Sequence, residues 1–596
     1  MSRTKQAAAA HSSRRRTIFA LGFIVILVAA FLVRLVDLQV VSASEYLADA
    51  GSKGLNGSRT LYGVRGTIVD SEGQVLASST QLYDAQIDPK VATGMQERNA
   101  DGETVEIPFS RYAPDIAQVL NLETAEVEAI VDDALAENAE SRFAYLKRNI
   151  TTAQYVDLVD LGLPFLSYVA QPSRVYPQGA VAGNLVGYMS GDDQPLAGYE
   201  LFENDCLAAS NGEETYQQSS GGIRIPGTEE SDPATNGGTV QLTIDSDLQW
   251  YMQEMIEEER KAKKANWGSV MVVDIETGAI KAAAESPSVD PNDRSASDEE
   301  DWGSKLFVST FEPGSTFKAV TAAMLLDSGT STPLSTMEVP AREVFDNGAV
   351  VNDAGLHPDY NYTLSGALVD SSNVGMSKFG DELSMSDRYD YLTKFGVGAQ
   401  TDVHFGGEAT GVLRPADEWD GQTRYTTTFG QGFTVTAPQV ASAYQVLADG
   451  GMKMPLHIVE SCTAADGTVT TPDVEEPTRV ISEKAADETL EMLENSAVLG
   501  PHQLDVPGYR IGLKTGTAQK SDGNGGYKAG VYATSIVGVA PIDDPKYVVM
   551  VTLDEPKTIR SSAATESALE KALNQVMKTY RVTPSTGEPT LYPKTK

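Results

Sequence analysis

The chain has 596 residues, which is too long for one compact core and predicts two or more domains. Hydrophobic residues make up 41% and charged residues 22%, the composition of an ordinary globular protein. The net charge of -37 argues against nucleic acid as the main partner and is typical of a highly soluble surface. The histidines form no HExxH motif and no metal-like cluster, which argues against a zinc hydrolase.

The N-terminus has the pattern of a membrane anchor. Residues 1–16 are basic, contain no acidic residue and are expected to be a cytoplasmic tail. Residues 17–36 are apolar, apart from Arg34 near the end, and predict a transmembrane helix because about 20 such residues span a bilayer. Basic charge before the span predicts a cytoplasmic N-terminus, with the rest of the chain outside. No second span follows, so we expect a single-pass protein of the cytoplasmic membrane.

A cleaved signal peptide is the alternative interpretation of this segment. Val41-Ser42-Ala43 loosely fits a peptidase site. The length of the apolar run, and the charged residues Arg34 and Asp37 that follow it, favour the anchor.

Residues 37–230 are predicted to form the first outer domain. The pattern of Val64–Ser79 predicts a strand, a turn and a strand, and Thr124–Asn138 has the pattern of an acidic helix. Pro226–Gly238 resembles a loop and predicts the boundary to the second domain.

Residues 238–582 are predicted to form a second domain of the α+β class, an antiparallel sheet flanked by helices. The expected elements are a strand at Thr239–Asp245, a helix at Ser246–Lys264, a hairpin at Ser269–Ala284, strands at Tyr532–Pro541 and Lys546–Glu555, and a helix at Thr565–Tyr580. Residues 290–500 are richer in helix and loop, and residues 583–596 are expected to be a polar tail.

The chain has two cysteines, Cys206 and Cys462. Their spacing does not suit a metal site. In an exported protein they could form a disulfide, but two separate buried thiols fit the sequence equally well.

The first motif with chemical meaning is FEPGSTFKAV, Phe311–Val320. Pro313 and Gly314 predict a helix start, which places Ser315 in the first turn and Lys318 one turn later on the same face. A serine hydroxyl becomes a good nucleophile when a base removes its proton, and a lysine with a lowered pKa can be that base. Alone, the SxxK spacing is also typical of an ordinary helix start.

The second motif is Ser371-Ser372-Asn373, a polar stretch between two apolar runs. It predicts a turn that could present Ser371 as a proton shuttle and Asn373 as a hydrogen-bond partner for a substrate amide. Alone, it is no more than a turn.

The third motif is IGLKTGTAQ, Ile511–Gln519, which has a strand-like pattern. Alternation places Thr515 and Thr517 on one face, where they could bind a carboxylate, and Lys514 on the other. Gly516 leaves room for an extended peptide along the strand. A polar edge strand protected by a lysine is the alternative.

Together the motifs stand in the order SxxK, SxN, KTG, which is the signature of penicillin-binding proteins and class A β-lactamases. Other segments resemble class B penicillin-binding proteins, the peptidoglycan D,D-transpeptidases. The matching segments are Arg65–Ala77, Arg174–Pro177, Gly198–Glu200 and Thr427–Ala441. Arg34 with Leu38-Gln39, and Ser288–Asp293, resemble the division-specific, FtsI-type branch more than the elongation branch. The resemblance implies a pedestal domain at residues 37–230 and a transpeptidase domain at residues 238–582.

The resemblance also implies the roles of individual residues. Ser315 would be the acylated nucleophile, Lys318 the general base and Ser371 the proton relay. The substrate would be held by Asn373, Lys514, Thr515, Gly516 and Thr517. No metal or organic cofactor is implied.

The implied partners are peptidoglycan stem peptides ending in D-Ala-D-Ala, β-lactams, a glycan polymerase of the SEDS family and other division proteins. The alternatives are an elongation-type transpeptidase, a D,D-carboxypeptidase, a β-lactamase or β-lactam sensor, and a division scaffold without catalysis.

Overall fold

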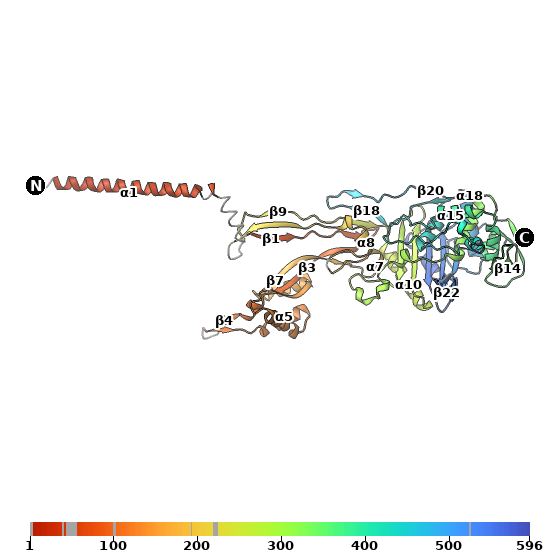
Figure 1. Cartoon of the computed structure of the whole chain (residues 1–596), viewed down its shortest axis with the longest axis horizontal. Coiled ribbons are helices and arrows are strands. Elements are labelled where there is room, and N and C mark those ends of the chain that lie inside the picture. Colours follow the sequence, from red (N-terminus) through yellow and green to blue (C-terminus); the bar gives the residue numbers. More distant parts are fainter. Residues whose placement is uncertain are drawn as a thin grey trace. The chain divides into compact units, whose positions relative to one another are not determined.

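The computed structural model describes residues 4–37, 41–42, 56–98, 103–191, 193–218, 224–523 and 526–596. The chain divides into two compact units. One consists of residues 1–63 and 210–235, and the other of residues 64–209 and 236–596. Figure 1 shows the chain coloured from the N-terminus to the C-terminus.

The first unit contains the helix α1, Thr4–Val36. Its stretch Ile18–Val36 has a mean hydropathy of 2.8 and is, among the described residues, the one helix long and apolar enough to cross a membrane. This agrees with the predicted span. The unit also contains an antiparallel sheet of β1 (Asn56–Leu61), β8 (Gly212–Gln217) and β9 (Glu230–Asp232). The strand β9 lies inside the segment that was expected to be a loop.

The second unit contains a mixed sheet to which both predicted domains contribute strands. The hairpin of β2 (Thr67–Val69) and β3 (Val75–Ile87) forms as predicted, with Ile68 opposite Ala77. The strand β10 (Thr239–Leu242) pairs in parallel with β2 and antiparallel with β18 (Val459–Thr463). The remaining strands are β6 (Ala144–Ile150), β7 (Leu166–Val175) and β19 (Val469–Thr470).

A separate small core lies beside β3, β6 and β7, with helices packed around Ile116, Val127 and Leu158. Its elements are α3 (Pro89–Thr93), β4 (Gln96–Arg98), β5 (Thr104–Glu106), η2 (Phe109–Arg111), α4 (Ala113–Leu120), α5 (Thr124–Glu137) and α6 (Thr152–Asp160). The helix α5 confirms the predicted acidic helix. The short helices α7 (Gly183–Val186), α8 (Gly198–Phe202) and α9 (Asn204–Leu207) follow β7.

The C-terminal part is built on a five-stranded antiparallel sheet in the order β12-β11-β23-β22-β21. The strands are β11 (Gly268–Asp274), β12 (Ile280–Ser286), β21 (Gly512–Ser521), β22 (Tyr527–Ala540) and β23 (Tyr547–Asp554). The predicted hairpin and the predicted C-terminal strand pair both form, and β11 lies directly beside β23 although almost 300 residues separate them (Figure 1). The strand β21 is one edge of this sheet.

Side chains alternate along each strand, so each face of the sheet carries its own set of apolar side chains. Helices cover both faces. Val270 and Val272 pack with α10 (Ser246–Lys263) and α19 (Glu566–Thr579). Met271 and Val273 belong to the core that includes α12 (Lys318–Asp327), α17 (Ala437–Ala448) and α18 (Glu483–Leu499). This arrangement confirms the predicted α+β class, with an antiparallel sheet flanked by helices.

The segment between β12 and α18 contains the expected helices and loops, and also several short strands that were not predicted. The helices are α11 (Lys305–Val308), α13 (Leu364–Val369), α14 (Asn373–Gly380), α15 (Met385–Lys394) and α16 (Thr423–Thr426). The strands are β13 (Thr336–Val339), β14 (Arg342–Val344), β15 (Val350–Asn352), β16 (Tyr360–Thr363), β17 (Met452–Lys453) and β20 (Thr478–Arg479). The 3-10 turns are η3 (Arg294–Ala296), η4 (Glu299–Asp301), η5 (Gly314–Phe317), η6 (Ala416–Glu418), η7 (Thr427–Phe429) and, beyond β23, η8 (Ser562–Ala564).

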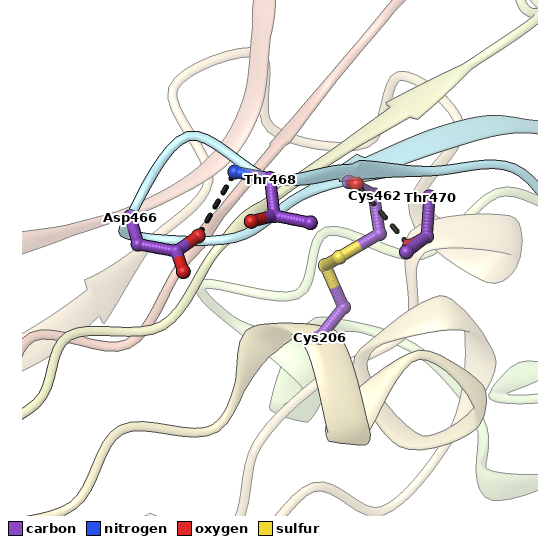
Figure 2. The surroundings of a disulfide bond; sticks show 5 residues. All are labelled: Cys206, Cys462, Asp466, Thr468 and Thr470. Carbon is purple, nitrogen blue, oxygen red and sulfur yellow. Dashed lines mark hydrogen bonds between the residues drawn. A yellow bond between two sulfur atoms is a disulfide. The ribbon is translucent and has the colours of Figure 1, made fainter.

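The two cysteines form a disulfide (Figure 2). Cys206 lies in α9 and Cys462 in β18, 256 residues apart, with their Cα atoms separated by 6.1 Å. The question that the sequence left open is therefore decided in favour of the disulfide. The bond joins the segment before the five-stranded sheet to a strand that follows α17.

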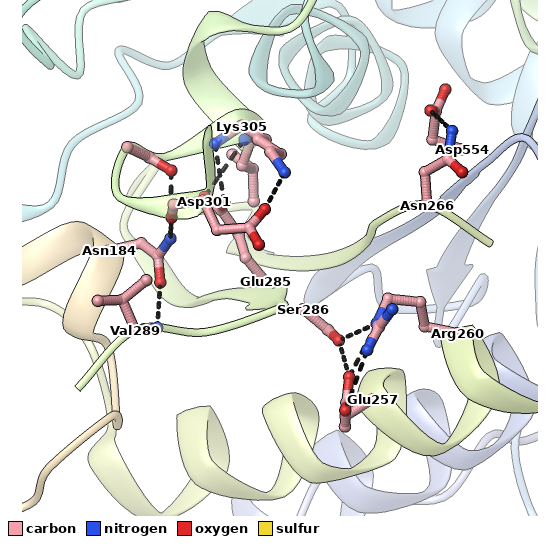
Figure 3. A network of polar contacts seen from close by, with 12 residues as sticks. Asn184, Glu257, Arg260, Asn266, Glu285, Ser286, Val289, Asp301, Lys305 and Asp554 are labelled. Carbon is pink, nitrogen blue, oxygen red and sulfur yellow. Dashed lines mark hydrogen bonds and ion pairs between the residues drawn. The ribbon is translucent and has the colours of Figure 1, made fainter. Parts of the chain in front are cut away.

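A buried polar network lies at the end of β12 (Figure 3). The carboxylate of Glu285 accepts hydrogen bonds from the backbone N–H groups of Lys305 (2.8 Å) and Leu306 (3.2 Å) and from the hydroxyl of Ser304. Burial nevertheless raises the pKa of Glu285 to about 7. The network fixes the start of α11, a few residues before the SxxK motif.

Candidate active site

The SxxK motif forms a tight turn rather than the α-helical start that was expected. Ser315 lies in the 3-10 turn η5, and α12 begins at Lys318. In a 3-10 helix the side chains at i and i+3 eclipse each other, so Ser315 and Lys318 are on the same side of the turn. Gly314 has a φ of 58° and donates its N–H to the carbonyl of Gly430 (2.8 Å). A Cβ on Gly430 would lie 2.1 Å from the carbonyl oxygen of Gly314, so only glycine permits this approach.

Lys318 is fully buried and points at the SxN turn. Its ammonium donates to the backbone carbonyl of Ser371 and lies 3.1 Å from the Ser371 Oγ. Burial, followed by the positive charge of Lys514, holds the pKa of Lys318 well below its usual value, while the negative charge of Asp353 opposes this shift. The amine is therefore suited to act as a base.

Ser371 occupies the turn between α13 and α14, as the sequence predicted, in the left-handed conformation with a φ of 56°. The next residue, Ser372, caps α14 by accepting the N–H of Gly375 (2.8 Å) and donates its hydroxyl to Asp353 (2.6 Å). Asn373 begins α14, and its side chain donates to the carbonyl of Asn352 (3.0 Å).

Lys514 on the edge strand β21 reaches the same serine. Its Nζ lies 3.0 Å from the Ser371 Oγ, and burial lowers the pKa of Lys514 to about 7. Only 2% of the residue is exposed, so its charge does not project from the strand edge to prevent pairing with another chain, which argues against that alternative interpretation. A Cβ on Gly516 would lie 2.5 Å from the Ser535 Oγ and 3.0 Å from the Pro313 carbonyl oxygen, so η5 packs directly on β21.

The two threonines of the third motif differ in their surroundings. Thr515 is buried, whereas Thr517 is exposed, and the hydroxyl of Thr517 accepts a hydrogen bond from the backbone N–H of Ser562 (2.9 Å). That bond uses a lone pair and leaves the hydroxyl proton free to donate to a ligand.

The structure thus brings the three motifs together. The ammonium groups of Lys318 and Lys514 converge on the hydroxyl of Ser371. Ser315 lies half-buried on the turn that carries Lys318, and its hydroxyl has no hydrogen-bond partner among the described residues. A hydroxyl, a low-pKa amine and a proton relay are the parts that acyl transfer through serine requires.

The motifs alone did not point to two carboxylates beside the site. Asp353 accepts hydrogen bonds from Ser372 and from the N–H of Val374 (2.9 Å), and so holds the SxN turn. Glu312, directly before Pro313, accepts from the N–H of Gly432 (2.9 Å) and from the hydroxyl of Tyr527. Glu312 could have been noticed because it lies within the Phe311–Val320 segment of the first motif, whereas no spacing pattern links Asp353 to any motif. Among the described residues, no cluster of His, Cys, Asp and Glu could hold a metal ion.

Comparisons with known proteins agree with this geometry. Residues 268–578 match the penicillin binding protein transpeptidase domain, and residues 60–242 match the penicillin-binding protein dimerisation domain. The chain is 33% identical to the penicillin-binding protein PbpB of Mycolicibacterium smegmatis, over 92% of this chain and 87% of that protein. It is 28% identical to the peptidoglycan D,D-transpeptidase FtsI of Escherichia coli K12, over 90% of this chain and 86% of that protein.

Solved structures show the same relationship. A peptidoglycan synthetase from Bifidobacterium adolescentis matches with a TM-score of 0.71 and 30% identity, covering 91% of this chain and all of that one. Penicillin-binding protein 3 from Mycobacterium tuberculosis, in complex with aztreonam, matches with a TM-score of 0.67 and 27% identity, covering 89% and 99%. The chain therefore belongs to the class B penicillin-binding proteins and is a peptidoglycan D,D-transpeptidase of the serine acyl-transferase type.

Proposed function

We propose that the chain cross-links peptidoglycan through an acyl-enzyme on Ser315, with Lys318 as the general base and Ser371 as the proton relay. The observation that carries the assignment is the position of the Ser371 hydroxyl, 3.1 Å from the Nζ of Lys318 and 3.0 Å from the Nζ of Lys514. A hydroxyl between a buried amine and a second cation is suited to pass a proton in either direction.

In the first step, Lys318 takes the proton of Ser315, and the Ser315 oxygen attacks the carbonyl carbon of the penultimate D-Ala. The peptide bond to the terminal D-Ala breaks, and its nitrogen receives a proton through Ser371. The backbone N–H groups of Ser315 and Thr517 stabilise the oxyanion.

The donor peptide lies along β21, whose outer edge is unpaired within the sheet. Lys514, Thr515 and Thr517 bind its terminal carboxylate, and Asn373 binds a backbone amide. Gly516 lets η5 pack on β21, because a side chain there would occupy the space of η5, and this contact keeps Ser315 beside the strand.

In the second step, an amine from a neighbouring stem peptide attacks the ester, and the hydroxyl of Ser315 regains its proton. β-Lactams acylate the same serine because their ring carbonyl mimics the D-Ala-D-Ala bond. The complex of a related protein with aztreonam supports this extension.

The cellular setting follows from the anchor. We place the N-terminus in the cytoplasm and the catalytic sheet outside, because basic residues precede the apolar segment of α1. Septal wall synthesis, with a SEDS-family polymerase and other division proteins as partners, is the setting that the FtsI-type segments favour. Enrichment of a fluorescent fusion at midcell tests that setting against lateral wall growth.

The decisive experiment is covalent labelling of Ser315→Ala with fluorescent penicillin. We expect no labelled band, because the variant lacks the oxygen that forms the ester. Ser328→Ala is the matched control, because this serine follows the other end of α12 and bonds only to nearby residues. Covalent labelling of Ser315→Ala would disprove the nucleophile, and growth supported by that variant alone would favour the scaffold alternative.

A further inference from the structure

The last residues of the chain lie against the catalytic core, although the sequence predicted a polar tail. Thr595 forms a β-bridge with Tyr362 of β16. The N–H of Thr363 donates to the carbonyl of Lys594 (2.9 Å), and the N–H of Lys596 donates to the carbonyl of Asn361 (3.1 Å). Backbone hydrogen bonds therefore add this segment to β16, whose other neighbour is β13.

The same segment contacts the start of α13, the helix that leads into the SxN turn. The hydroxyl of Thr363 accepts the N–H of Gly366 (2.9 Å) and thereby caps α13, and it also donates to the carbonyl of Pro593 (2.7 Å). A Cβ on Gly366 would lie 1.9 Å from the carbonyl oxygen of Lys594. The helix and the C-terminal segment are thus in direct backbone contact.

The C-terminal segment and β16 also hold the end of α13. The Nζ of Lys594 lies 2.7 Å from one carboxylate oxygen of Asp370, and the hydroxyl of Tyr362 donates to the other oxygen (2.8 Å). Asp370 directly precedes Ser371, and Lys594 lines a cavity of about 460 Å³ that Ser371 also lines.

Ser371 needs such support, because its left-handed φ of 56° is a conformation that residues with a side chain rarely adopt. Asp353, which lines the same cavity, accepts hydrogen bonds from the hydroxyl of Ser372 and the N–H of Val374. Two carboxylates, Asp370 and Asp353, therefore hold the turn whose Ser371 hydroxyl lies beside Lys318 and Lys514.

We propose that residues 592–596 form a C-terminal strap that positions the proton relay, with Lys594 and Asp370 as positioning residues for acyl transfer. The proposal rests on the proposed function of Ser371. Without the ion pair, Asp370 keeps only the hydrogen bond from Tyr362. The end of α13 then shifts, and the carbonyl and hydroxyl of Ser371 move away from the Nζ of Lys318. The strap itself stays bound, because its backbone hydrogen bonds do not depend on the Lys594 side chain.

The test compares full-length Lys594→Ala, Lys594→Arg and Lys596→Ala in detergent, with a fluorescent penicillin as the probe. Lys596 is the matched control, because its side chain is exposed and its backbone makes the bond to Asn361. For Lys594→Ala we expect the maximal acylation rate constant to fall about tenfold, since small misplacements of reacting groups cost at least this much. The apparent dissociation constant and the midpoint of thermal unfolding should not change, Lys594→Arg should restore the rate, and Lys596→Ala should match the unaltered protein.

An unaltered acylation rate in Lys594→Ala would overturn the strap, as would an equal loss in Lys594→Arg or a loss that only accompanies lower thermal stability. If Lys594→Ala does not fold, Asp370→Asn decides, because it keeps the shape of the side chain and removes the charge pair. These outcomes are separate from that of Ser315→Ala, which tests the nucleophile and leaves the strap contacts unchanged.

Discussion

Two buried lysines share one hydroxyl at the centre of the site. Lys318 and Lys514 each lie within 3.1 Å of the Ser371 Oγ, and burial lowers the pKa of both. Keeping a lysine out of water costs folding free energy unless an acid neutralises it. The buried lysines that the reaction requires thus lower the stability of the fold, and the substitution of either lysine should show this effect.

We predict that Lys318→Met strongly slows acylation without destabilising the protein. The methionine thioether fits a buried site. Because the variant lacks the basic amine of Lys318, acylation should be about a thousandfold slower. Removal of the desolvated amine should leave the thermal midpoint unchanged or raise it by about 2 °C. Calorimetry and penicillin labelling measure the two effects. Lys484→Met, at an exposed position on α18, should change neither, and a marked loss of stability in Lys318→Met would contradict the expectation.

At the scale of elements, the two packing contacts of η5 decide how the nucleophile is presented. Gly314 and Gly430 allow backbone to pack on backbone, and Gly516 leaves β21 open to η5. The sequence identified this strand and the start of α12, but it predicted an α-helical turn. A 3-10 turn could not be predicted, because the contact that tightens it comes from Gly430, more than 100 residues away.

We predict that Glu285, which fixes the start of α11, makes stability depend on pH. Folding raises its pKa from 4.5 to about 7, so the folded state binds more protons in that range and the free energy of unfolding falls as pH rises through it. Glu285→Gln removes this dependence. Relative to that of the unaltered protein, the variant's free energy of unfolding should rise by about 2–3 kcal/mol from pH 4.5 to pH 8. Denaturant titrations at both values provide the measurement.

The control is Glu276→Gln, at an exposed position in the turn between β11 and β12. It should leave the pH dependence of the unfolding free energy as it is. Glu285→Gln and the unaltered protein could instead differ in free energy of unfolding by the same amount at pH 4.5 and at pH 8. That result would argue against a neutral Glu285 in the folded state.

For the whole molecule, the sequence predicted the local elements and the order of the motifs, because both depend on short-range patterns. The α5 helix, the β11–β12 hairpin and the β22–β23 pair form within a few residues of the expected limits. Contacts between distant segments that carry no motif were not predictable. No local sequence pattern indicates the ion pair between Lys594 and Asp370 or the hydrogen bond from Ser372 to Asp353. The predicted domain limits at residues 37, 230, 238 and 582 stay predictions.

The disulfide gives a prediction at this scale. The double variant Cys206→Ser, Cys462→Ser should lose about 2–5 kcal/mol of unfolding free energy, since the bond closes a loop of 256 residues. Penicillin acylation at 25 °C should persist, because neither cysteine touches the site. Chemical reduction of the unaltered protein should lower the thermal midpoint equally and leave the double variant unaffected. An unchanged midpoint after reduction would show that the bond contributes no stability.

The position of β10 between β2 and β18 has a practical consequence for anyone who isolates the catalytic portion. A fragment that starts at Ser246 would lose Val240, Leu242 and Ile244 from the core. It would also leave β18 with an unpaired edge on the side where β10 pairs with it. Such a fragment would tend to aggregate, whereas one that begins before β2 keeps the shared sheet whole.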